Sequence, residues 1–160
     1  MSLSVINRDR AILALVVVIL TLAATGEAQS TVERFQLFND CQPIDIVVER
    51  LPREAGEIGL RGEAIQATVE SRLRSAHLYD PEAVPFLYIN VNVGPRAFHI
   101  SLEFHKEVRD LASGLSSTAP TWLTGVTGTH GRDSGYLLSL ISRQIEEFLG
   151  EFLEVNGEAC

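Results

Sequence analysis

Hydrophobic and polar residues alternate in two neighbouring stretches of the chain, residues 86–93 and 97–105. The apolar positions are Leu87, Ile89, Val91 and Val93 in the first stretch, and Phe98, Ile100, Leu102 and Phe104 in the second. A period of two residues is typical of a strand with one buried face. Because Gly94 and Pro95 separate the stretches, the pattern predicts a β-hairpin with one apolar side.

Two other stretches have apolar residues at spacings of three and four, the period of an amphipathic helix. They are residues 60–77, with Ile65, Val69, Leu73 and Ala76, and residues 133–155, with Leu137, Ile141, Ile145, Phe148 and Phe152. We expect both helices to cover the apolar side of the hairpin, and Gly157 to end the second helix. The expected core is Leu87, Ile89, Val91, Phe98, Ile100, Leu102, Ile65, Val69, Leu73, Ile141, Ile145 and Phe148.

The remaining stretches complete the expected fold. A short alternation in residues 43–51, ended by Pro52, predicts one more strand before the first helix. Residues 110–134 are rich in Gly, Ser and Thr, so we expect mostly loop there, with at most a short strand from Thr118 to Val126. This order predicts an α+β fold, a small and mostly antiparallel sheet with two helices packed on one face.

The chain begins with a segment typical of a secretory signal. Arg8 and Arg10 precede an unbroken apolar run, and the small residues Gly26 and Ala28 fit the requirements of a signal peptidase. We therefore expect cleavage before Gln29. The alternative is an uncleaved membrane anchor, which needs about 20 apolar residues, more than this run provides.

The expected organisation is a signal peptide in residues 1–28, an N-terminal extension in 29–42 and a single α+β domain in 43–160. Residues 1–28 contain two basic and two acidic residues, so the net charge of −8 is the same without them. This acidic balance opposes binding to nucleic acids and to anionic lipid surfaces. We expect no stable insertion in a membrane after signal cleavage.

The two cysteines of the chain, Cys41 and Cys160, are expected to form a disulfide. An exported protein meets an oxidising compartment, where such bonds form and persist. The bridge would fasten the C-terminus to the start of the sheet. Pairing between two chains is the alternative.

The order of elements from Pro43 to Asn156 resembles that of the small periplasmic domains at the N-terminus of TolB and in curli-secretion proteins of the CsgG type. It is also similar to small exported proteins of Gram-negative bacteria. The resemblance implies a binding or assembly role in the bacterial envelope rather than catalysis. It assigns a role to no individual residue.

Three titratable side chains, His99, Glu103 and His105, share the polar face of the second hairpin strand. Glu103 and His105 are about 6.6 Å apart along an extended strand, close enough to share a metal ion, whereas His99 is roughly 20 Å from His105. A third ligand would have to come from elsewhere in the chain. The alternative is an ordinary solvated sheet face, and we expect no metal and no cofactor.

Three glycines, Gly125, Gly128 and Gly131, recur before the last helix, where Asp133 or Ser134 could form the cap. Backbone amides in such a loop could cradle an anion. Asp133 would place a negative charge at the same amides, so a flexible connection is the alternative.

Two further candidates lie near this loop. His130 could act as a base for Ser134, although no G-x-S-x-G motif surrounds this serine. Trp122, the single tryptophan of the chain, could contact a partner or anchor its segment to the core.

An acidic stripe follows the last helix, formed by Glu147, Glu151, Glu154 and Glu158. A basic partner or a cation could use it, and a solvated helix face is the alternative.

The candidate residues do not form a convergent catalytic group in the sequence. We therefore expect a non-catalytic binding or accessory protein of the bacterial periplasm or envelope, with an envelope protein or a small ligand as its partner. The alternative is a small periplasmic hydrolase or metal-dependent enzyme that uses the face of His99, Glu103 and His105 or the loop at His130.

Overall fold

One strand and two helices form the first half of the fold, and a three-stranded meander and a long helix form the second half. A computed structural model describes residues 31–160, of which residues 36–160 form one compact unit. The elements are β1 (Asp45–Val48), α2 (Arg53–Glu57), α3 (Gly62–Ser75), β2 (Phe86–Val93), β3 (Ala97–Arg109), β4 (Ser116–Thr129) and α4 (Ser134–Asn156). The unit includes residues 36–42 of the expected extension. The expected signal peptide, residues 1–28, lies outside the described residues.

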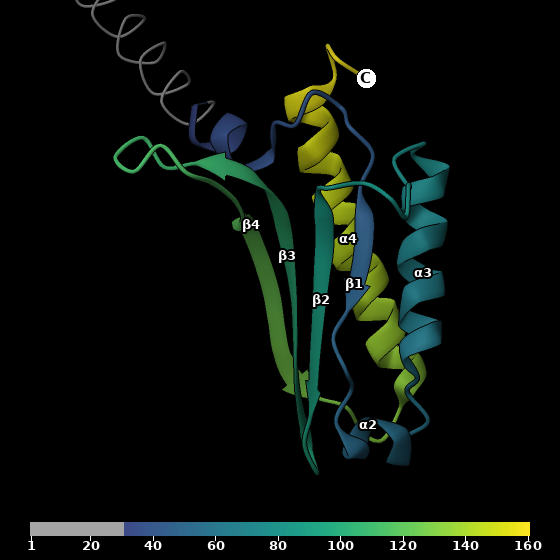
Figure 1. Ribbon diagram of the computed structural model, residues 1–160. Coiled ribbons are helices and arrows are strands. Elements are labelled where there is room, and N and C mark those ends of the chain that lie inside the picture. Colours follow the sequence, from purple (N-terminus) through teal and green to yellow (C-terminus); the bar gives the residue numbers. More distant parts are fainter. Residues whose placement is uncertain (1–30) are drawn as a thin grey trace, which may run out of the picture. The chain divides into compact units, whose positions relative to one another are not determined.

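The four strands form one sheet in the order β1-β2-β3-β4 (Figure 1). Strand β1 runs parallel to β2, whereas β2 with β3 and β3 with β4 are antiparallel. A parallel pair needs a long crossover connection, and here the segment with α2 and α3 provides it. The expected α+β class, with a mostly antiparallel sheet, is confirmed.

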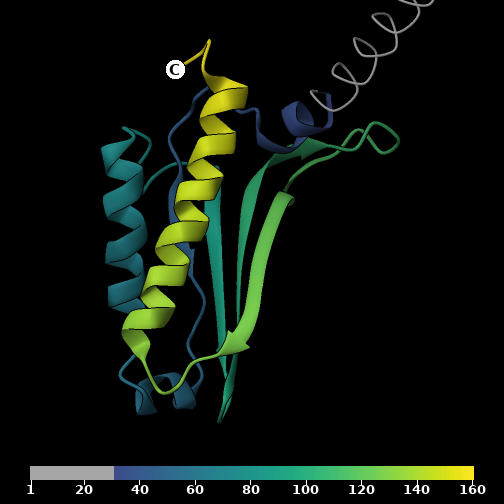
Figure 2. The same cartoon turned by 180° about the vertical axis from the view of Figure 1, so that it is seen from behind.

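Helices α3 and α4 lie side by side on one face of the sheet (Figures 1 and 2). Each of the twelve residues expected in the core is at most 3% exposed, because alternate strand residues and one stripe of each helix face the same layer. Helix α4 ends at Asn156, directly before Gly157, as expected. Within the described residues, no helix combines the length and apolar character needed to cross a membrane.

Strand β4 corrects the expectation that residues 110–134 are mostly loop. It covers fourteen residues, and each of them except Thr121 pairs with a residue of β3. The glycine at position 128 is needed for packing and not for a turn, since a Cβ atom at Gly128 would lie 3.0 Å from the ring of Phe98. A long neighbouring strand supplies hydrogen bonds that outweigh the weak strand propensity of glycine and serine.

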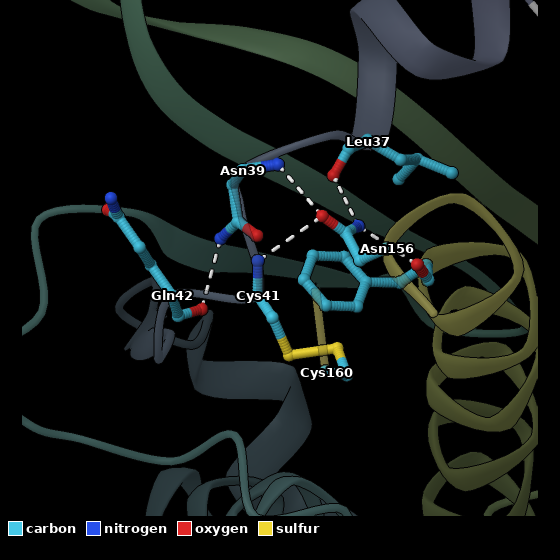
Figure 3. The surroundings of a disulfide bond; sticks show 7 residues. Leu37, Asn39, Cys41, Gln42, Asn156 and Cys160 are labelled. Atoms are coloured by element: carbon cyan, nitrogen blue, oxygen red, sulfur yellow. Dashed lines mark hydrogen bonds between the residues drawn. A yellow bond between two sulfur atoms is a disulfide. The ribbon is translucent and has the colours of Figure 1, made fainter. Parts of the chain in front are cut away.

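The disulfide between Cys41 and Cys160 is present, and the Cα atoms of the two residues are 5.2 Å apart. The backbone N–H of Cys160 also donates to the carbonyl of Asn156. Figure 3 shows this bridge beside the last turn of α4. The bridge thus holds the C-terminus against the segment that precedes β1.

Asn156 forms a second link between the two ends of the domain (Figure 3). Its side chain is 1% exposed, and its Oδ1 accepts hydrogen bonds from the backbone N–H groups of Asn39 and Cys41, at 3.0 and 3.4 Å. Its Nδ2 donates to the carbonyl oxygens of Leu37 and Phe152, at 3.1 and 2.9 Å. Both ends of the carboxamide are therefore satisfied by backbone groups, which fixes the segment before β1 on α4.

We expect the substitution Asn156→Ala to lower the free energy of unfolding by about 2–3 kcal/mol, because buried backbone groups lose their partners. Urea unfolding followed by circular dichroism measures this. Glu154→Ala, an exposed position in the same turn, is the matched control and should change stability by less than about 0.5 kcal/mol. Equal losses in the two variants would show that the Asn156 contacts do not stabilise the domain.

Candidate functional site

Helices α3 and α4 cover one face of the sheet (Figure 1), and the alternate hairpin residues that are not buried under them lie on the opposite face. They are Phe86, Tyr88, Asn90 and Asn92 of β2, and His99, Ser101, Glu103 and His105 of β3. We call these eight residues the open face. Because each is partly or fully exposed, their side chains are available to a ligand.

Two of the predicted site residues, Glu103 and His105, meet on this face. The Nε2 atom of His105 lies 2.9 Å from Oε2 of Glu103. The imidazole also stacks on the ring of Phe86, with centroids 4.6 Å apart and planes 13° apart, and meets the edge of Tyr88 at 6.0 Å. The two aromatic rings and the carboxylate thus hold the His105 ring in one orientation.

A second carboxylate, that of Glu49 directly after β1, joins this group. A hydrogen bond to Glu49 raises the pKa of Tyr88 above its usual value, with smaller contributions from burial and from the negative charges of Glu49 and Glu103. Glu49 also accepts a hydrogen bond from Nδ2 of Asn90. The result is an acidic and aromatic surface. Local spacing does not predict Glu49, Phe86 or Tyr88 as site residues. Only the strand register places Phe86 and Tyr88 beside His105, and Glu49 beside Tyr88.

The third predicted residue of this face, His99, lies apart from the pair. Its Nδ1 shares a hydrogen bond of 2.9 Å with Oγ1 of Thr127 on β4, and both residues are exposed. Among residues 31–160, no three or more His, Cys, Asp or Glu side chains are grouped closely enough to hold a metal ion. Glu103 and His105 therefore form a pair of potential ligands.

His130 is buried, with 3% exposure, and backbone groups occupy both of its ring nitrogens. Nε2 donates to the carbonyl of Gly94 at 3.0 Å, and Nδ1 accepts from the backbone N–H of Arg132 at 2.9 Å. The ring thus ties the β4–α4 turn to the β2–β3 turn. Its hydrogen bonds leave no ring nitrogen available to Ser134, the first residue of α4.

The predicted glycine loop is not formed, because Gly125 and Gly128 are paired residues of β4. Only Gly131 lies in the turn before α4, where it has a positive φ of 54°. The helix is capped by Asp133, whose Oδ1 accepts from the backbone N–H of Tyr136 at 3.1 Å. A row of amides that could cradle an anion is therefore missing from this part of the described chain.

Trp122 lies on β4 and faces the core, with 7% exposure. Its ring packs on Phe148 with centroids 5.1 Å apart, and its Nε1 donates to Oε2 of Glu151 at 2.8 Å. One flank of α4 therefore faces β4. Glu146, on the other flank, pairs with Arg72 of α3 at 3.0 Å.

An open groove lies between the end of β1, α2 and the start of α3. Its charged lining residues are Glu49, Arg50, Arg53, Arg61, Glu63 and Glu70. Since both signs of charge are mixed along the groove, its electrostatics favour neither anions nor cations.

No protein-family model, curated protein or solved structure matches this chain. The resemblance to the TolB and CsgG-type domains stays a prediction from the order of the elements.

Proposed function

We propose that this protein is an exported, non-catalytic binding or accessory protein of the bacterial periplasm or envelope. One observation carries the proposal: helices α3 and α4 cover a single face of the sheet (Figures 1 and 2). The other face presents the ordered group of Phe86, Tyr88, Glu103 and His105. An exposed surface of ordered aromatic and charged side chains is typical of a binding site.

The hydrogen bonds of the histidines support binding over hydrolysis. A hydrolase of the nucleophile and base type needs a hydroxyl or thiol beside the base, and a third group that orients the base. His105 bonds to a carboxylate and His130 to backbone groups. His99 does bond to a hydroxyl, that of Thr127, but this pair is exposed and carries no orienting group among the described hydrogen bonds.

The disulfide supports the cellular location. Stable structural disulfides are typical of the periplasm and of secreted proteins, and are rare in the cytosol of most organisms. The basic and apolar N-terminal segment, with small residues at Gly26 and Ala28, points the same way. Both features fit an exported protein.

Photo-crosslinking in a Gram-negative host tests the binding role. The full-length chain would carry a photoreactive residue at Asn92 of the open face or at Leu123, which is 65% exposed on β4. We expect the protein to be found in the periplasm and to form defined adducts from both positions. The matched control is Arg53 on α2, which is exposed and should form none. Identical adduct patterns at all three positions would contradict a specific binding surface.

The enzymatic alternative has its own test. Purified exported protein should contain no stoichiometric zinc after dialysis, since Glu103 and His105 supply only two ligands where stable sites use at least three protein ligands. Elemental analysis of the wild type and of His105→Ala measures this. Zinc that is retained by the wild type and lost in His105→Ala would favour the metal-dependent enzyme.

A further inference from the structure

Strand β4 forms one edge of the sheet, and its outer side pairs with no segment of residues 36–160. None of its fourteen residues is charged. Proteins usually protect long edge strands with lysine or other charged residues, because free N–H and C=O groups are a template for a further strand. The opposite edge strand, β1, has only four residues. The outer side of β4 is thus the main place where this sheet can be extended.

Two features limit the usable part of this edge. Pro120 lacks an N–H group, and the register of β3 and β4 shifts between Phe104 and His105, so that Thr121 has no partner residue on β3. Thr121 instead donates through its hydroxyl to the carbonyl of Gln36 at 2.6 Å. The regular edge is therefore residues 122–129 of β4, roughly 27 Å of strand.

One flank of α4 lies beside this edge. Because Glu151 bonds to Trp122, that flank faces β4, and in Figure 2 β4 and α3 lie on opposite sides of α4. Glu147 and Glu154 are four residues before and three after Glu151, so they lie on the same flank, and both are exposed. Gln144, three residues before Glu147, is 6% exposed, and its side-chain oxygen has no hydrogen-bond partner among the described residues.

We propose that the edge formed by residues 122–129 binds an extended segment of a partner protein, which adds a fifth strand and carries Lys or Arg at alternate positions. This inference rests on the proposed binding function and names its surface and the chemistry of its partner. Side chains of an added strand alternate between the two faces of the sheet, so every second one lies on the helix side. Near Trp122 these side chains lie beside Glu147 and Glu154, where positive charge is favourable.

A second copy of this chain fits the edge less well. Antiparallel pairing of two β4 strands would bring two acidic flanks of α4 to the same side of one sheet. Like charges in that position repel, and β4 contributes no Lys or Arg to offset them. Charge complementarity therefore favours a basic partner segment over self-association.

A synthetic peptide tests the proposal. The probe is a blocked peptide of about ten residues in which lysine alternates with valine, long enough to pair with the regular edge. The fluorescence of Trp122, the single tryptophan, reports binding to the purified, oxidised mature chain. We expect a saturable change that weakens as salt is added, and no change with a peptide in which glutamate replaces lysine.

N-methylation separates strand pairing from simple charge attraction. In an added strand, alternate N–H groups point toward β4 and the others point away. Two peptides of equal composition would carry N-methyl groups on one or the other alternate set. We expect one to bind and the other not; equal binding by both would overturn pairing at the edge.

Substitutions on α4 test the acidic flank. Glu147→Gln combined with Glu154→Gln should weaken binding of the lysine peptide by about threefold to tenfold. Glu146→Gln, on the flank that faces α3, is the matched control and should leave binding unchanged. Equal effects would overturn the charge assignment.

Sedimentation experiments test for self-association. A dimer that the lysine peptide dissociates would identify a second copy as the occupant and overturn the assigned partner.

The outcomes also separate this inference from the proposed function. If the peptides do not bind while photo-adducts form at Asn92 and Leu123, the edge proposal is wrong and the binding function stands. If neither is observed, both are wrong.

Discussion

Replacing Phe148 by alanine should lower the free energy of unfolding by about 3–5 kcal/mol. Phe148 is completely buried, and its ring centroid lies 5.6 Å from that of Phe104, 5.5 Å from Phe152 and 5.1 Å from Trp122. These contacts join α4 to both β3 and β4. Truncation removes apolar burial and leaves a cavity that rigid neighbouring strands cannot close. Since small domains are commonly stable by about 5–15 kcal/mol, the loss would be a large share of the total.

Urea unfolding of the oxidised protein, followed by far-ultraviolet circular dichroism, measures this loss. Leu153→Ala is the matched control, since Leu153 lies on the same helix but is 39% exposed. We expect the control to lose less than about 1 kcal/mol. A larger loss for Leu153 than for Phe148 would mean that α4 packs on the sheet through a different face.

Reduction of the Cys41–Cys160 disulfide should lower the free energy of unfolding by about 2–5 kcal/mol. The bridge joins residues 119 positions apart, and closing a loop of that length in the unfolded chain corresponds to about 5 kcal/mol of chain entropy. The hydrogen bonds of Asn156 hold the same two segments together. The folded domain therefore keeps its contacts after reduction, and the effect falls mainly on the unfolded state.

The double variant Cys41→Ser/Cys160→Ser provides the control for reductant. Its stability should match that of the reduced wild type, and reductant should not change it further. A wild type with the same stability in both redox states would contradict a stabilising bridge. A non-reducing gel tests the remaining alternative, because a reducible dimer would indicate pairing between chains.

Parts of the candidate site could be predicted from local spacing alone. A period of two residues puts Glu103 and His105 on the same face, and the structure brings them together. Their neighbours Phe86 and Tyr88 come from another strand, and Glu49 from beyond β1. These residues are brought together by the register between strands. The spacing of residues within one segment does not reveal that register, so the aromatic and acidic character of the site could not be predicted.

Strand β4 shows where local propensity misleads. Glycine, serine and threonine are typical of turns, and the segment 116–129 is rich in them. The segment is nevertheless a strand because β3 offers backbone partners to all of its residues except Thr121. At Gly128 the absence of a side chain also makes room for the ring of Phe98.

The sequence alone predicts the hairpin of β2 and β3, the helices α3 and α4 and the core they share, and it favours a disulfide within the chain over one between two chains. These features follow from the period of apolar residues and from a cysteine count that allows one intramolecular bridge. The parallel pairing of β1 with β2 and the long uncharged edge at β4 are visible only in the three-dimensional structure. The structure also shows that Asn156 binds Asn39 across 117 residues of chain and that Glu151 binds Trp122. Such contacts join segments that are far apart in the chain. The sequence around each partner has no periodic pattern that indicates them.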